Sequence, residues 1–218
     1  MRRRLWLNGL ALVMFGAFLI FIVLQSVTGW RSSNSEREVF GAPPESYMEY
    51  VASGDFVEAT FENWESEFLQ IGSYVLLTAF LVQKGSPESN PVEGNEEDPE
   101  QDAEPDSPGP VKRGGAVLKL YENSLSLVIF ALFVLSFVLH LLGGTAAFNE
   151  EQQLWHQPTV SVREFFFSSD FWFQSMQNWQ SEFLSVGVLI VLGIFLRQRK
   201  SSQSKPVATP HSETGTSN

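Results

Sequence analysis

Two matched stretches of the sequence hold the polar groups that could do chemistry at the edge of apolar segments. The first, NWESEFLQIG, begins at Asn63, and the second, NWQSEFLSVG, begins at Asn178. On a helix, residues four apart share a face, so Asn63 should lie beside Glu67, and Asn178 beside Glu182. Such carboxylates could hold an ion or a substrate, because ionisable groups at membrane depth are functional candidates by default. We favour a structural role, because a carboxylate near the start of a helix is stabilised by the helix dipole.

Other polar residues extend this candidate site. The face of the first motif continues into Gln70, Tyr74 and Thr78, whereas the matching stripe of the second motif fades after one turn. His140 lies on another apolar segment, at the same expected level as the two glutamates. The candidate functional or structural cluster therefore comprises Asn63, Trp64, Glu67, Gln70, His140, Asn178, Trp179 and Glu182.

No catalytic, cofactor-binding or metal-binding pattern accompanies these residues in the sequence. It lacks the G-x-S-x-G and H-E-x-x-H motifs, the phosphate-binding loop and the dinucleotide glycine fingerprint. It has no cysteine, and its three histidines stand at no metal-binding spacing. It has no basic patch for a nucleic acid, and nine of its acids fall between Glu88 and Asp106. We therefore expect a protein that is not an enzyme and that uses no cofactor, metal or nucleic acid.

The apolar residues are gathered in four blocks, which begin at Leu5, Phe68, Leu125 and Phe183. A helix of about 20 apolar residues crosses the hydrocarbon core of a bilayer, and the first and third blocks reach that length. The second and fourth blocks are shorter, and alone they would also fit buried helices of a soluble domain. Each gains length if the N-W-x-S-E turn before it lies in the interfacial layer.

The chain repeats itself at an offset of 115 residues, the distance from Asn63 to Asn178. The matches include apolar positions, but also loop residues such as Asn34 with Asn149. Apolar runs resemble each other by chance, whereas matched polar residues do not, so we interpret the pattern as an internal duplication. Each copy is then a two-span unit whose shorter block is the return helix. The first block is expected to be a retained anchor and not a cleaved signal, because its counterpart is internal.

The basic residues give the four expected spans an orientation. Eleven of the 14 Lys and Arg residues would lie on the side of the termini, and three on the other side. Positive residues stay in the cytoplasm, so both termini should be cytoplasmic and both repeats should point the same way. We thus expect an all-α bundle of four transmembrane helices, built from two tandem parallel repeats. Its parts are the first repeat (1–86), a disordered acidic cytoplasmic linker (87–115), the second repeat (116–201) and a disordered cytoplasmic tail (202–218).

The two outer loops contain more aromatic residues than a solvated loop would hold, as in SYMEYVASGDF and SVREFFFSSDF. Asp55 and Asp170 are predicted N-caps of the helices that follow, because a carboxylate accepts the free amide hydrogens of a first turn. We expect a short helix before each aspartate and interfacial helices in both loops. Trp64 and Trp179 would then lie in the outer aromatic belt of the membrane.

The string FENWESEFLQIGSYVLLTAFLVQKGS, with SGDF upstream of it, resembles a family of small prokaryotic integral membrane proteins known as a domain of unknown function. In that family F-x-N-W-x-S-E-F-L-Q precedes an apolar span that ends in Q-[KR]-G-S. The second copy departs from this motif, with Gln180 in place of Glu65 and Ser185 in place of Gln70. The resemblance implies a prokaryotic multi-pass protein of the cell membrane and brings no activity with it. It makes the first copy the better candidate for a site.

Two functions fit these observations. The first is a structural or interaction protein of the cell envelope, whose partners are the lipid bilayer and another membrane or envelope protein, or a second copy of itself. The alternative is a small transporter or channel that uses the Glu67/Glu182 pair. A dry, tightly packed bundle would favour the first function, and a cavity that reaches the membrane midplane from Glu67 would favour the second.

Overall fold

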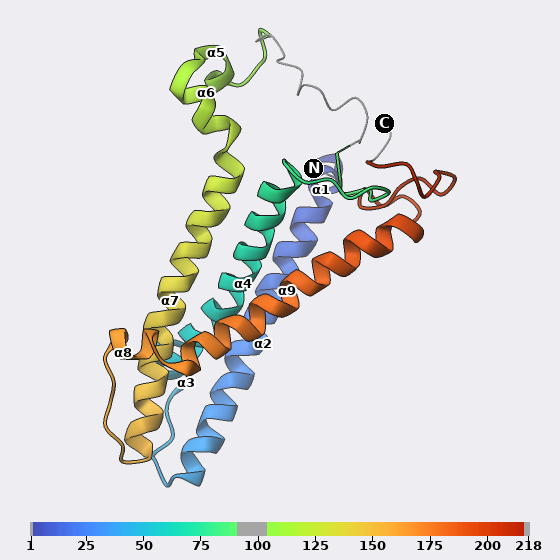
Figure 1. The fold of residues 1–218 in the computed structure, drawn as a ribbon. Coiled ribbons are helices and arrows are strands. Elements are labelled where there is room, and N and C mark those ends of the chain that lie inside the picture. Colours follow the sequence, from blue (N-terminus) through green and yellow to red (C-terminus); the bar gives the residue numbers. More distant parts are fainter. Residues whose placement is uncertain (1, 91–103, 216–218) are drawn as a thin grey trace. The chain divides into compact units, whose positions relative to one another are not determined.

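The computed structural model describes residues 2–90 and 104–215, and their regular structure is helical (Figure 1). This confirms the predicted all-α class. Of the linker predicted at 87–115, residues 91–103 lie outside the described residues. The helices are α1 (Arg2–Leu7), α2 (Gly9–Val39), α3 (Tyr47–Val51), α4 (Gly54–Thr78), α5 (Gly109–Arg113), α6 (Gly115–Glu122), α7 (Ser124–Leu154), α8 (Val162–Phe166) and α9 (Ser169–Phe195).

Three helices of the described chain, α2, α7 and α9, are long and apolar enough to cross a membrane. The predicted return span of the first repeat is not among them. Its helix, α4, has 25 residues, but its last 18 include Glu62, Glu65 and Glu67. The helix also ends at Thr78, and the last apolar residues of the block, through Val82, lie beyond its end. The charge on α4 therefore separates it from the other three helices.

The chain divides into two compact units, and three helices belong partly to each. Unit 1 consists of Met1–Phe61 and Val138–Phe171, which include α2, α3, the start of α4, the second half of α7, and α8. Unit 2 consists of Glu62–Phe137 and Trp172–Asn218, which include the rest of α4, the first half of α7 and most of α9. The first and second NW motifs both lie in unit 2.

Corresponding helices begin 115 residues apart. This holds for α2 and α7, for α3 and α8, and for α4 and α9, and α9 continues for two residues beyond the position that matches the end of α4. The short helices expected before Asp55 and Asp170 are present as α3 and α8. The offset of 115 residues that relates matching residues in the sequence therefore also relates the starts of matching helices in the structure.

Two hydrogen-bonded clasps close the loops after α2 and α7 in unit 1. The side chain of Asn34 accepts from the backbone N–H of Glu45 (2.8 Å) and donates to its carbonyl (3.1 Å). Asn149 does the same with Val160, at 2.7 Å and 2.9 Å. In each case the amide side chain bonds both the backbone N–H and the backbone C=O of one residue, as a neighbouring β-strand would. These two bonds fix the loop although it has no regular secondary structure. The matched asparagines of the sequence thus have a structural explanation.

Each loop then enters its short helix through a capping box. Ser46 and Glu49 cap α3 reciprocally, and Ser161 and Glu164 cap α8 in the same way. The next helices are capped by serine and not by the predicted aspartates. Ser53 accepts the backbone N–H of Phe56, and Ser168 accepts that of Phe171, both at 3.3 Å. Because α4 and α9 begin one residue before each aspartate, these carboxylates fall in the first turn.

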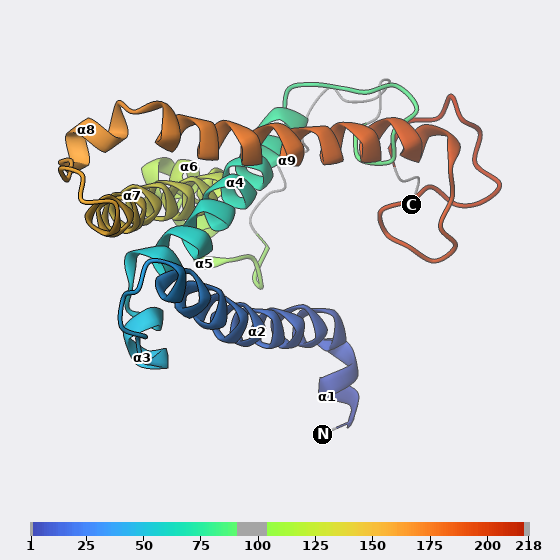
Figure 2. The ribbon, with the colours of Figure 1, turned by 90° about the horizontal axis from the view of Figure 1, so that it is seen from below.

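Close backbone contacts hold unit 1 together around small residues. A Cβ on Gly54 of α4 would lie 2.5 Å from the backbone nitrogen of Ala147 in α7, and one on Gly143 would lie 2.7 Å from the nitrogen of Glu58. The helices therefore touch through their backbones. Figure 2 shows α3 beside α2, where a Cβ on Gly29 would lie only 2.0 Å from the hydroxyl oxygen of buried Tyr50.

Candidate functional site

The two NW motifs occupy the middle of α4 and α9, and their glutamates do not share one environment. In the first motif Asn63 and Glu67 are exposed, Trp64 is half-buried, and Gln70 is buried. Glu65 is fully buried. In the second motif Asn178, Trp179 and Glu182 are half-buried. Packing has thus turned the helix so that Glu65, and not Glu67, lies inside unit 2.

Two hydrogen bonds join the second motif on α9 to α4 in unit 2. The indole N–H of Trp179 donates to Oε1 of Glu65 at 2.8 Å, and the amide of Asn178 donates to Oε1 of Glu62. A buried carboxylate is costly unless donors satisfy it, so the indole contributes to the stability of this arrangement. Neither Glu62 nor Glu65 belongs to the site predicted from the sequence. One feature of the sequence could have pointed to Glu65: the matching position of the second copy is Gln180, so the two copies differ there.

Glu67 and Glu182, the pair proposed from the sequence, lie in unit 2 and are close enough for their charges to repel each other. His140 belongs to unit 1, where it is fully buried and its ring centroid lies 4.9 Å from that of Phe171. The Gln25 amide, at the matching position in the first copy, donates to Thr60 in unit 1 at 3.4 Å. The structure therefore brings the motif residues together in unit 2 and gives His140 an aromatic neighbour in unit 1.

Aromatic rings surround the second motif in unit 2. The ring centroid of Trp179 lies 6.1 Å from that of Phe133 on α7 and 6.4 Å from that of Trp172 on α9, both in edge-on geometry. Trp172 in turn lies 6.2 Å from Phe137. Edge-on pairs of this kind add to the stability that burial alone provides. Trp179 is thus a packing residue as well as a hydrogen-bond donor.

A pocket of about 440 Å³ lies between α4 and α9, inside unit 2. Gln70, Tyr74 and Thr78 line it, so the polar stripe of the sequence analysis lines a cavity. Phe183, Val186, Gly187 and Ile190 of α9 supply apolar surface. The segment after α4 adds six further lining residues: Leu81, Val82, Gln83, Ser86, Glu88 and Ser89. The volume falls within the range of small-molecule sites, which are mostly apolar with a few polar groups.

The loop that follows α4 is fastened to the C-terminal tail in unit 2. The ammonium group of Lys205, 1% exposed, donates to the backbone carbonyls of Gly85 (2.5 Å), Glu213 (2.8 Å), Pro210 (3.2 Å) and His211 (3.2 Å). The N–H of Gly215 also donates to the carbonyl of Ser86 at 2.9 Å. Composition alone would not indicate such contacts, because the acceptors are backbone groups.

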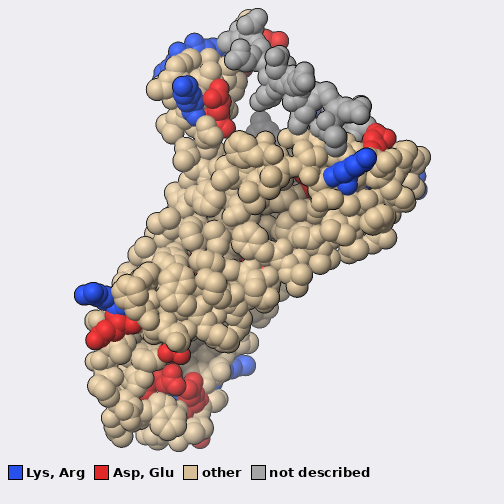
Figure 3. Space-filling view, in the orientation of Figure 1, with Lys and Arg blue, Asp and Glu red and all other residues tan. Residues whose placement is uncertain are grey.

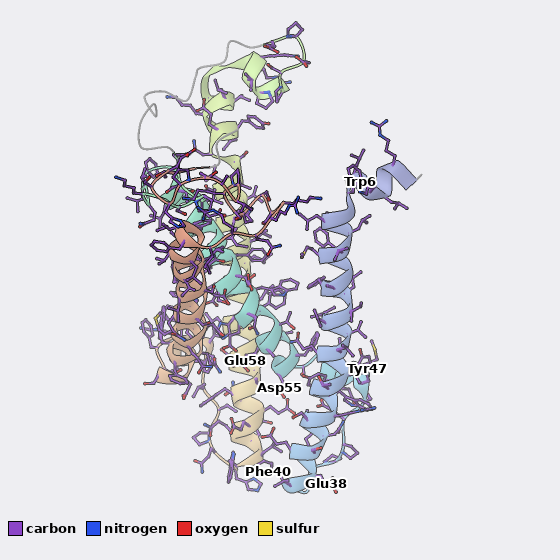
Figure 4. The ribbon with its side chains drawn as sticks, turned by 90° about the vertical axis from the view of Figure 1, so that its right-hand side faces the viewer. Trp6, Glu38, Phe40, Tyr47, Asp55 and Glu58 are labelled. Carbon is purple, nitrogen blue, oxygen red and sulfur yellow. The ribbon has the colours of Figure 1, made fainter. Side chains whose placement is uncertain are left out.

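Unit 1 contains a second group of charged residues, around Asp55. Burial raises the pKa of Asp55 to about 6, and the negative charges of Glu150, Glu45 and Glu36 act in the same direction. Arg37 opposes them and forms an ion pair with Glu150. On the face shown in Figure 3, acidic side chains of unit 1 gather where the loops join α2 to α4 and α7 to α9. Figure 4 shows Asp55 and Glu58 at the N-terminal end of α4.

Within the described residues, no group of three His, Asp or Glu side chains is placed to hold a metal ion. Comparison with curated proteins and with solved structures found no match. The family described as domain of unknown function DUF6766 matches residues 1–216. The match covers both NW motifs and the pocket. It also covers the two segments of unit 1 that we call the outer hairpins, residues 40–53 with α3 and residues 155–168 with α8. This chain therefore belongs to the DUF6766 family.

Proposed function

We propose that this protein is a multi-pass integral protein of the prokaryotic cell membrane, with four spans arranged as two parallel repeats. The 115-residue spacing of α2 and α7, α3 and α8, and α4 and α9 supports the repeat. The repeated clasps and capping boxes add support, because they match in detail and not only in length. In this layout the apolar part of α4, from Phe68 onward, provides the remaining span, its N-terminal part lies outside the hydrocarbon core, and both termini are cytoplasmic.

Cysteine labelling tests this topology without background, because the chain has no native cysteine. Cysteines at exposed Ser32 and Thr159 should react with a membrane-impermeant thiol reagent added outside intact cells, and cysteines at Asp106 and Ser202 should react only after permeabilisation. Outside labelling at Asp106 would contradict the four-span layout.

The function that the geometry supports best is that of a structural or interaction protein of the cell envelope. The observation that carries it is the rigid construction of the outer hairpins in unit 1. Clasps, capping boxes and glycine contacts fix their backbone, while Phe167 and Met48 remain 72% and 70% exposed. Exposed apolar side chains on a preformed frame favour binding to a partner over anchoring alone.

Site-specific photo-cross-linking in cells tests this function. A photoreactive residue at Phe167 should give one discrete protein adduct, whereas one at the exposed apolar residue Leu12 of α2 should give none, since α2 faces lipid in the proposed layout. The absence of any protein adduct at Phe167 and at Met48 would refute an interaction role for the hairpins.

A small transporter or channel is the second candidate, and the pocket of unit 2 is the observation that favours it. The lining begins at Gln70 and Phe183, next to the Glu67/Glu182 pair. Under this function Glu67→Gln would abolish flux in proteoliposomes while the fold stays intact. Under the structural function Glu67→Gln would be mild, and Trp64→Ala would cost about 3 kcal/mol of stability through lost ring burial.

A further inference from the structure

The pocket between α4 and α9 has a feature that helix packing does not explain. A Cβ on Gly187 would have no other heavy atom within 4 Å, so this glycine leaves space on the pocket wall. Its counterpart 115 residues earlier, Gly72, is needed for packing, since a Cβ there would lie 3.2 Å from Ile129 of α7. The two glycines therefore occupy matched positions with different surroundings, and the one without a packing contact lines the cavity.

The pocket also carries a fixed negative charge. Among the described residues that line it, Glu88 is the one with a charged side chain. The hydroxyl of Tyr74 donates to Oε2 of Glu88 at 3.1 Å, and the backbone N–H of Glu88 donates to the hydroxyl of Ser86 at 3.2 Å. The Gln203 amide, oriented to donate, lies 2.6 Å and 3.0 Å from the two carboxylate oxygens. These neighbours are neutral, so they hold the carboxylate in place without cancelling its charge.

The nearby cation of the tail is engaged elsewhere. The ammonium of Lys205 is enclosed by four backbone carbonyls, among them that of Gly85. This cage fixes the loop that carries Glu88. The loop is further held against α9, where a Cβ on Gly193 would lie 3.1 Å from the ring of Pro87. The wall that bears the charge is thus preformed, which lowers the cost of ordering on binding.

We infer that this pocket binds a hydrophobic organic cation, an ammonium group that carries an apolar chain. The carboxylate of Glu88 supplies the countercharge, and Tyr74 and Phe183, which also line the pocket, are aromatic residues of the kind that attract a cation. The side chains of Val186 and Ile190 provide the apolar surface for the chain. An anionic amphiphile meets the same apolar wall, but it is repelled by the charge. The inference does not depend on the envelope function or on transport.

Calorimetric titration of the full-length protein in nanodiscs of zwitterionic lipid tests the inference. The probes are decyltrimethylammonium and decanoate, below their micelle concentrations, with empty nanodiscs as the reference for partitioning. The cation should bind saturably at one site and decanoate should not. Glu88→Gln, which keeps the shape and removes the charge, should weaken binding of the cation about tenfold. Gly187→Phe, which fills the cavity, should abolish it.

Matched variants separate the pocket from general effects. Glu104→Gln removes an acid outside the pocket, and Val188→Phe adds a ring to α9 at an exposed position that does not line it. Both should bind the cation as the wild-type protein does. Circular dichroism checks that each variant is folded. If Gly187→Phe does not fold, the binding of the cation to Glu88→Gln alone tests the inference. Equal binding of cation and decanoate, no binding of the cation, or undiminished binding to folded Glu88→Gln would overturn the inference.

Discussion

Replacing Asp55 with asparagine should stabilise the protein at neutral and alkaline pH. The folded protein raises the pKa of this carboxyl from 3.8 to about 6, which corresponds to about 3 kcal/mol of unfolding free energy lost when the group is charged. Two effects reduce this loss: solvent screens the charge of the partly exposed side chain, and a helix N-terminus favours a negative charge by about 0.3–1 kcal/mol. We therefore expect a net gain of about 2 kcal/mol for Asp55→Asn at pH 8.

The sign follows from proton binding. Between pH 4 and pH 6 the folded state holds more of this proton than the unfolded state, so the contribution of Asp55 to stability falls as pH rises. The penalty is complete above the folded pKa and disappears as pH falls toward the unfolded value. The gain from Asp55→Asn should accordingly shrink to near zero by pH 4. A gain of about 2 kcal/mol corresponds to a rise in Tm of about 4–8 °C at this chain length.

Thermal unfolding in mild detergent, followed by circular dichroism at pH 4, 6 and 8, measures the effect. Asp170→Asn is the matched control, because Asp170 occupies the corresponding first turn of α9 but is exposed. Asp170→Asn should lower the stability by about 0.3–1 kcal/mol at pH 8, because it removes a negative charge from a helix N-terminus. If Asp55→Asn is neutral or destabilising at pH 8, or if its effect is the same at pH 4, the reasoning about burial and neighbouring charge is wrong.

Three further changes have expected results. Gly143→Ala should lower stability by about 1–3 kcal/mol, because the new Cβ meets the α4 backbone. Gly16→Ala, where the Cβ meets open space, should be neutral or stabilising, and thermal unfolding of the two variants compares them. Trp179→Phe should cost about 1–3 kcal/mol in chemical unfolding, because buried Glu65 loses its indole donor, and a cost below the scatter of replicates would refute that role. Lys205→Met should increase hydrogen exchange in the loop around Gly85, and unchanged exchange would show that the carbonyl cage does not hold it.

Local patterns predicted the elements of this fold well. Each apolar block lies mostly in helix, the short helices α3 and α8 occur where the aromatic loops indicated them, and the matched asparagines form matched clasps. These features depend on a few neighbouring residues, so the sequence carries them directly. The predicted caps were wrong by two residues. Serine is as suitable an N-cap as aspartate, and α4 and α9 begin directly after Ser53 and Ser168.

The composition of the site depended on contacts that a single sequence does not encode locally. Glu65 and Glu67 of the first motif and the preceding Glu62 lie within two helical turns of each other, and the rotation of α4 against α9 selects Glu65 for burial. Asp55 is perturbed by acids from α2, from the loop after it and from α7, which lie far apart in the chain. The cage around Lys205 uses backbone carbonyls, which have no sequence signature. Each of these features follows from tertiary packing.

Under the proposed duplication, the places where the two copies differ indicate where they took on separate tasks. In unit 1 the copies keep the same clasps, capping boxes and serine caps, so the frame of the hairpins is the same in both. In unit 2 the matched positions diverge: Glu65 is buried while Gln180 is exposed, and Gly72 packs while Gly187 opens onto the pocket. A frame needs both copies alike, whereas a single asymmetric pocket needs them different. The variant Gly187→Phe is therefore expected to affect ligand binding without affecting stability, and Gly72→Phe to affect stability itself.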